Sequence, residues 1–157
     1  QVKALAAYRV AAAAGHREAQ LAVAQMLAAG DEMARREALD WYRLAAESGH
    51  RTAMNRLGEL HRDGVDAGRD EVLARKYFLR AAELGDPRAM YNAAVMVDEG
   101  RGGLRDQGDS LRLFALAADA GDVEAARLIE RLLGTASSGT MSGVVGANEV
   151  SRGFWQR

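Results

Sequence analysis

Three histidines, His16, His50 and His61, are the side chains of this sequence best suited to bind a metal ion. None of them has the i, i+4 spacing with which two histidines on one helix face hold zinc. The chain contains no Cys, which excludes disulfides, thiolate nucleophiles and Cys-ligated zinc. The sequence therefore predicts no metal site and no cofactor. We expect His16 and His50 to cap helices and His61 to pack inside the fold.

Two loops carry residues that bind ions in other proteins. Residues 100–108, GRGGLRDQG, are rich in glycine, but the Lys-Ser/Thr of a phosphate-binding P-loop does not follow them. Residues 63–71, DGVDAGRDE, are acidic, but their carboxylates miss the ligand positions of an EF-hand calcium loop. We interpret both segments as solvated loops.

Catalytic motifs are missing as well. There is no G-x-S-x-G nucleophile motif, and no Ser, His and Asp that a repeat fold would bring together. Acidic pairs such as Asp98-Glu99 are interpreted as surface charge. The sequence predicts that the chain is not an enzyme.

Charge and hydropathy exclude two classes of partner. The 21 basic and 22 acidic residues nearly balance, so no global field draws the chain to nucleic acid. No apolar run approaches the ~18 residues that span a bilayer, so we expect no membrane insertion. Most basic residues are arginine, which with abundant Ala and Gly is typical of a GC-rich bacterial genome. Bacterial cytoplasm and periplasm both stay open.

An internal repeat shows which elements must position these side chains. One phrase, an aromatic residue, two further residues and Ala-Ala, occurs four times and is followed each time by Gly. The aromatic residues are Tyr8, Tyr42, Phe78 and Phe114, and the glycines are Gly15, Gly49, Gly85 and Gly121. The glycines are 34, 36 and 36 residues apart. Self-similarity at this period predicts a solenoid of stacked units.

Each unit divides into two helices, A and B. Apolar residues of helix A recur at i, i+4, i+7 and i+8, as in Ala19, Val23, Met26 and Leu27, which is one face of an α-helix. The sequence thus predicts an all-α fold, a right-handed α/α solenoid of helix-turn-helix repeats of 34–36 residues. We expect a lone helix B at 1–14, repeats at about 16–49, 50–85 and 86–121, and a terminal helix A at 122–133. The lone helices are end caps or, as we favour, mark a chain cut from a longer array.

The glycines have predicted conformations. Those that follow helix B, and Gly30, Gly64 and Gly100 after helix A, are expected to end helices in the left-handed region. Gly58 lies inside helix A, where we expect it to let a neighbouring helix approach closely. Asp86-Pro87 predicts an Asp N-cap with Pro at the first helical position.

These residues carry a resemblance to a known family. The fullest copy reads Ala53, Leu57, Gly58, His61, Gly64 and Val65 in helix A, then Ala74, Tyr77, Phe78, Ala81, Ala82 and Gly85 in helix B. This pattern resembles the Sel-one-like repeat, a relative of the tetratricopeptide repeat, over residues 1 to 133. The resemblance implies a non-enzymatic bacterial adaptor in signalling, envelope assembly or regulation. The alternative is a regulatory or recruiting fragment of a larger enzyme or secretion machine.

The resemblance also implies that the A helices line a concave face that binds a protein or peptide. Carrying the groove-facing positions across the repeats gives three rows of candidates, in which Asn can bond to a peptide backbone and Arg can clamp a carboxylate. The candidates are Leu21, Asn55, Tyr91 and Arg127, then Gln25, Glu59, Val95 and Arg131, then Arg62 and Asp98.

The last segment, 134–157, departs from the repeat. Residues 134–148 are small and polar and read as a flexible linker. Phe154 and Trp155 then stand between Arg152 and Arg157. We expect these aromatics to dock on the chain's own repeats or on those of a neighbour. The alternatives are that this segment is an added sequence, a fused ligand peptide or the start of a further domain. The chain begins with Gln1 and shows no signal peptide, which predicts a processed product or a fragment.

Overall fold

Eight helices and no strand make up residues 2–137, the part of the chain described by this computed structural model. Their bounds are α1 Val2–Ala13, α2 Arg17–Ala28, α3 Glu32–Glu47, α4 Arg51–Asp63, α5 Glu71–Glu83, α6 Pro87–Glu99, α7 Gln107–Asp119 and α8 Val123–Ser137. The expected all-α solenoid is confirmed. α8 runs to Ser137, past the predicted end at residue 133. The proposed anchors Phe154 and Trp155 lie outside the described residues.

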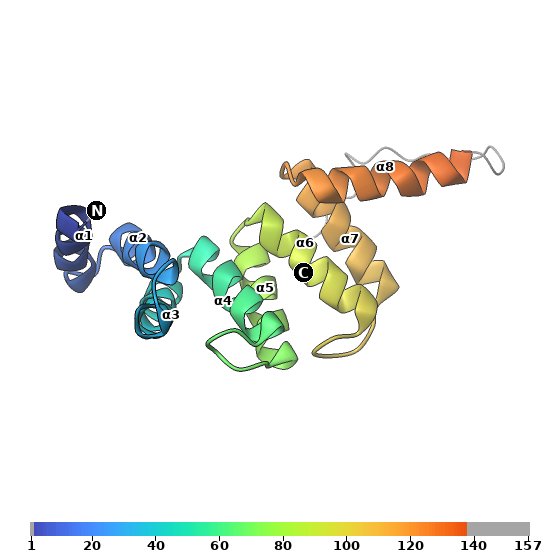
Figure 1. Cartoon of the computed structure of the whole chain (residues 1–157). Coiled ribbons are helices and arrows are strands. Elements are labelled where there is room, and N and C mark those ends of the chain that lie inside the picture. The colour runs from blue at the N-terminus through green and yellow to red at the C-terminus, as the bar shows by residue number, and fades with distance from the viewer. Residues whose placement is uncertain (1, 138–157) are drawn as a thin grey trace.

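The helices pack chiefly in chain order. α2 pairs with α3, α4 with α5 and α6 with α7, and each pair packs against the next. Figure 1 shows these pairs following one another in a row, from α1 at one end to α8 at the other. Alanines fill the contacts because their small side chains let helix axes approach closely. Six recurring ones are fully buried: Ala45, Ala81 and Ala117 in the B helices, and Ala53, Ala89 and Ala125 in the A helices.

The glycines that close the helices mostly behave as predicted. Gly15, Gly49, Gly85 and Gly121 after the B helices, and Gly64 and Gly100 after α4 and α6, all have positive φ. The prediction for Gly30 is wrong, since it does not have a positive φ. Three residues separate α2 from α3, as many as in the turns that contain Gly49 and Gly85, so the length of the turn does not explain the difference. A Cβ on Gly30 would instead lie 2.6 Å from the Cβ of Ala34.

Gly58 admits a neighbouring side chain, as predicted. It lies in the middle of α4, and a Cβ added there would come within 2.6 Å of Cε1 of Phe78 on α5. Phe78 is itself fully buried. The Phe78 ring therefore occupies the space that a side chain at position 58 would need.

Aspartates, not histidines, cap the helices with their side chains. The Asp86 carboxylate accepts the Ala89 amide at 2.9 Å, as predicted, and Pro87 follows it. Asp31, Asp70 and Asp106 accept amides in the same way. His16 and His50 stand at N-cap positions but make no side-chain cap bond, so their predicted capping role is wrong.

The imidazoles of His50 and His61 serve packing and bridging. His50 Nε2 lies 2.9 Å from Oε2 of Glu18 in the preceding repeat, and this bond lowers the pKa of Glu18. His61 is buried and stacks on Tyr77, with ring centroids 5.9 Å apart, as its predicted packing role requires.

Candidate binding groove

A groove with a volume of about 430 Å³ opens between α3, α4 and the start of α6. Its apolar part consists of Ala28, Ala38, Leu39, Tyr42, Leu60 and Val65. Four arginines and three carboxylates complete its lining: Arg35, Arg56, Arg62 and Arg88, with Glu59, Asp63 and Asp66. Burial raises the pKa of Tyr42 above its ordinary value, so its phenol stays neutral.

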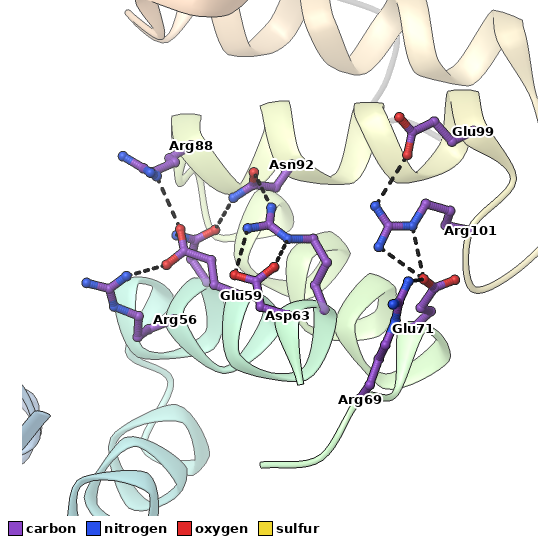
Figure 2. Close-up of polar contacts among 11 residues, drawn as sticks. Arg56, Glu59, Asp63, Arg69, Glu71, Arg88, Asn92, Glu99 and Arg101 are labelled. Carbon is purple, nitrogen blue, oxygen red and sulfur yellow. Dashed lines mark hydrogen bonds and ion pairs between the residues drawn. The ribbon is translucent and has the colours of Figure 1, made fainter. Parts of the chain in front are cut away.

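Glu59 is the centre of the polar side of the groove. Its Oε2 accepts from Arg56 at 2.5 Å, and its Oε1 accepts from Arg88 at 3.2 Å and from Asn55 at 3.3 Å. Figure 2 shows the carboxylate between the two guanidinium groups, one from α4 and one from α6. Only 8% of Glu59 is exposed, and a carboxylate this buried is tolerated because charged donors surround it.

Arg62 and Asp63 form a second unit one turn further along α4. Arg62 donates to Asp63 through Nε at 2.7 Å and through Nη2 at 3.2 Å, and these bonds lower the pKa of the Asp63 carboxyl. Arg62 also donates from Nη1 to the Asn92 side-chain oxygen at 3.3 Å. The Asn92 amide in turn donates to Asn55 at 3.0 Å. Side chains thereby bridge α4 and α6 (Figure 2).

Asp66 closes the groove from the loop that follows α4. Its backbone has a φ of 56°, which is uncommon for a residue other than glycine. Its carboxylate accepts from Nε of Arg35 on α3 at 3.0 Å. Arg35 also donates to the Gly30 carbonyl at 3.2 Å, so one arginine ties two successive A-to-B loops together.

A separate charge cluster braces the next pair of loops. Glu71 accepts from Arg69 at 2.7 Å and from Arg101 at 3.0 and 3.1 Å, and these bonds hold its pKa below the ordinary value. Arg101 also pairs with Glu99, as Figure 2 shows. A Cβ on Gly102 would lie 2.1 Å from the Glu71 carbonyl oxygen. The glycine-rich loop therefore serves close packing of loop against helix.

The structure divides the predicted site residues into three groups. Asn55, Glu59 and Arg62 come together in the network above, with their polar groups engaged inside the chain. Tyr91 and Val95 are half-buried on α6, where Tyr91 meets Phe114 edge-on at 5.5 Å. The remaining candidates lie apart from this network. Asp98 contacts Ser110 and Arg105. Leu21 is half-buried and Gln25 is exposed on α2, and Arg127 and Arg131 are exposed on α8.

Sequence reasoning missed several residues of the groove, namely Arg35, Tyr42, Arg56 and Arg88, and it also missed Asn92 in the hydrogen-bond network beside the groove. One signal was available. Arg56 precedes Glu59 by three residues, the spacing at which helix side chains meet. Nothing local links Glu59 to Arg88, because these residues are 29 positions apart in the sequence and lie on two different helices.

Two further observations concern metals and membranes. Within residues 2–137, no three His, Asp or Glu side chains gather as metal ligands. Over the same residues, no helix combines the length and apolar character that crossing a bilayer demands.

The repeats of this chain match a known protein family. The family model described as Sel1 repeat matches residues 17–50, 51–86 and 87–122. The chain belongs to the Sel1 repeat family. Sel1 repeats generally act as protein–protein interaction modules and are generally non-catalytic. Among curated proteins, no sequence matches the chain.

Solved structures show the same fold. c5321, a protective antigen of uropathogenic Escherichia coli with an SLR fold, is 34% identical with a TM-score of 0.70. That match covers 74% of this chain but 26% of c5321, so the chain spans about a quarter of its length. A Sel1 repeat protein from Oxalobacter formigenes is 28% identical with a TM-score of 0.75, over 81% of this chain and 97% of that one. Helicobacter pylori cysteine rich protein B, at 18% identity and a TM-score of 0.58 over 60% and 71%, shares the fold.

Proposed function

We propose that the chain is a non-enzymatic binding module whose A-helix face holds a segment of a protein or a peptide. The observation that carries the proposal is the groove around Glu59, which joins an apolar floor to a few fixed polar groups. Ligand sites in proteins combine these two features, and a volume of about 430 Å³ is within their usual range. Because the similar solved structures come from bacteria, we further propose a bacterial adaptor in signalling, envelope assembly or regulation.

Rigidity of the groove supports this role. Its arginines come from three helices, and Arg35, Arg56 and Arg88 each pair with a carboxylate. Side chains that are already ordered lose less conformational entropy when a ligand binds. The groove is therefore better suited to binding than an equal area of unpaired surface arginines.

Tyr91 and Val95 extend the proposed surface along α6. Tyr91 lies one helical turn after Arg88, and both residues are partly exposed. Aromatic side chains with one face open are frequent anchors in protein interfaces. We propose that a bound segment runs from the groove across this part of α6, toward Arg127 and Arg131 on α8.

Photocrosslinking from two faces of the solenoid tests the proposal. Benzoylphenylalanine replaces Tyr91 in one variant and Val72 in the other, a residue of α5 that is 68% exposed. Each protein is irradiated in a lysate of the source organism. We expect covalent protein adducts at position 91 and none at position 72. Adducts at position 72 alone would overturn the assignment of the binding face.

A further inference from the structure

We propose that the groove recognises an acidic side chain of an extended peptide, together with an apolar side chain two positions away, with Arg56 and Arg88 as the carboxylate-binding pair. This inference rests on the proposed function, because it specifies the ligand of the same groove.

The acceptors of the groove are already engaged. Glu59 accepts from three residues, Asp63 from both arms of Arg62, and Asp66 from Arg35. Four arginines face three carboxylates in the lining, which leaves one positive charge in excess. A ligand that brings a further carboxylate balances this charge.

Arg56 and Arg88 are the arginines with donors to spare. A guanidinium carries five N–H donors in a fixed fork. Arg88 reaches Glu59 through Nε, with 75% of its side chain exposed, and Arg56 reaches it through Nη1, with 55% exposed. Arg56 also contacts the Tyr42 hydroxyl, but each of the two guanidinium groups keeps donors that Glu59 does not use, on a side chain that is more than half exposed. Arg62, by contrast, uses Nε, Nη1 and Nη2 within the chain.

Glu59 holds this pair ready for a ligand. It binds Arg88 through one oxygen and Arg56 through the other, so two guanidinium groups from different helices share one buried carboxylate. A second carboxylate, from a ligand, meets two donors whose positions are already set, and charge-assisted bonds of this kind are stronger than neutral ones. A basic ligand side chain would instead meet two arginines of like charge.

The apolar residues of the groove determine which second side chain of the ligand can bind beside the acidic one. Leu39, Tyr42 and Leu60 line the groove beside the arginine pair. Successive side chains of an extended peptide point to opposite sides, so an acidic residue and an apolar one separated by one position reach the same surface. The expected ligand is an acidic residue with an aliphatic or aromatic residue two positions away.

A displayed library of random linear peptides, selected on the immobilised protein, tests this ligand chemistry. We expect selected sequences to be enriched in Asp or Glu near an apolar residue. Changing the acid of a selected peptide to its amide should weaken binding about tenfold. The same peptides, synthesised with a free and with an amidated C-terminus, distinguish a side-chain carboxylate from a terminal one.

Protein variants then assign the carboxylate to its partner. Arg88→Gln should weaken the acidic peptide about tenfold and leave the amide peptide unchanged. Arg56→Gln should act in the same direction. Arg80→Gln removes an exposed arginine of α5 outside the groove and should change neither affinity. Circular dichroism of each variant verifies that the helices are intact.

The failures of the two proposals are distinguishable. Selected peptides without acidic residues, or acidic peptides that bind both arginine variants normally, would overturn the ligand chemistry. If such peptides still block crosslinking from position 91, the binding face stands. Peptides that bind without blocking that crosslink, or a library that yields no binder, count against both proposals.

Discussion

Glu59 shows how one buried side chain can organise a binding surface. Its carboxylate lies against Asn55 and two arginines and holds together side chains from α4 and α6. Because the arginines are more than half exposed, water partly screens these pairs. Glu59 is nevertheless buried, so it gains little from solvent and depends on its three partners.

Removal of Glu59 should cost both stability and order in the groove. Glu59→Ala leaves Arg56 and Arg88 side by side with no counter-charge between them. We expect the free energy of unfolding to fall by about 1–3 kcal/mol in urea titrations. Glu130→Ala, which removes an exposed glutamate on α8, is the matched control and should change it by less than about 0.5 kcal/mol. Equal effects of the two substitutions would show that the network adds no stability.

Asp63 makes stability depend on pH in acid. Hydrogen bonds from Arg62 lower its pKa in the folded state below the unfolded value of about 3.9. A lowered folded pKa contributes stability that is fully present above the unfolded pKa and is lost as pH falls through the folded one. We expect Asp63→Asn to be less stable than the unsubstituted chain above about pH 5, with the difference shrinking below about pH 4. Urea titrations at several pH values measure this difference in the free energy of unfolding. A difference that grows toward low pH would contradict the pairing of Asp63 with Arg62.

At the scale of elements, the contact of α4 with α5 depends on an absent side chain. Gly58 lies where the Phe78 ring packs. Gly58→Ala gains about 1 kcal/mol of helix propensity, but overpacking a filled core costs about 1–3 kcal/mol, so we expect a net loss of stability. Gly108→Ala on α7, where the nearest atom is 3.4 Å away, should be neutral or stabilising. Thermal unfolding compares the two, and a more stable Gly58→Ala would show that Phe78 moves aside freely.

Helix boundaries were predictable because repetition fixes them. One phrase and one glycine recur at nearly constant spacing, so each copy supports the others, and Gly49, Gly85 and Gly121 have the predicted positive φ. Capping was less predictable. His50 occupies the position that Asp86 holds one repeat later, but an imidazole there reaches Glu18 instead of the amides of its own helix. Equivalent positions share backbone geometry without sharing side-chain chemistry.

The groove was harder to predict than the helices. Placing Asn55 and Tyr91 in one row assumes that equivalent positions are equally exposed. Asn55 is buried, whereas Tyr91 is only half-buried, and Asn92, equivalent to the exposed Arg56, is buried against Asn55. Side-chain size and inter-helix bonds decide these differences, and neither is visible in the repeat pattern.

At the scale of the whole molecule, docking of the C-terminal aromatics stays a prediction. Trp41 and Trp155 are the two tryptophans of the chain, and Trp41 on α3 donates to Glu37 at 3.1 Å. In a Trp41→Phe variant the emission therefore comes from Trp155 alone. We expect emission at shorter wavelength than that of a solvated tryptophan, since docking would bury the ring. Emission of a fully solvated tryptophan over a wide range of protein concentrations would exclude docking to the chain itself and to a neighbour.

The central claim is that partners bind the A-helix face at the arginine pair. The most direct measurement is the Kd of a partner captured through position 91, determined by calorimetry for two double variants of equal charge loss. The groove variant combines Arg56→Gln with Arg88→Gln. The α5 variant combines Lys76→Gln with Arg80→Gln, two substitutions of exposed residues. We predict that the groove variant raises Kd about tenfold or more and the α5 variant less than about twofold. A larger effect of the α5 variant, or no effect of the groove variant, would contradict the claim.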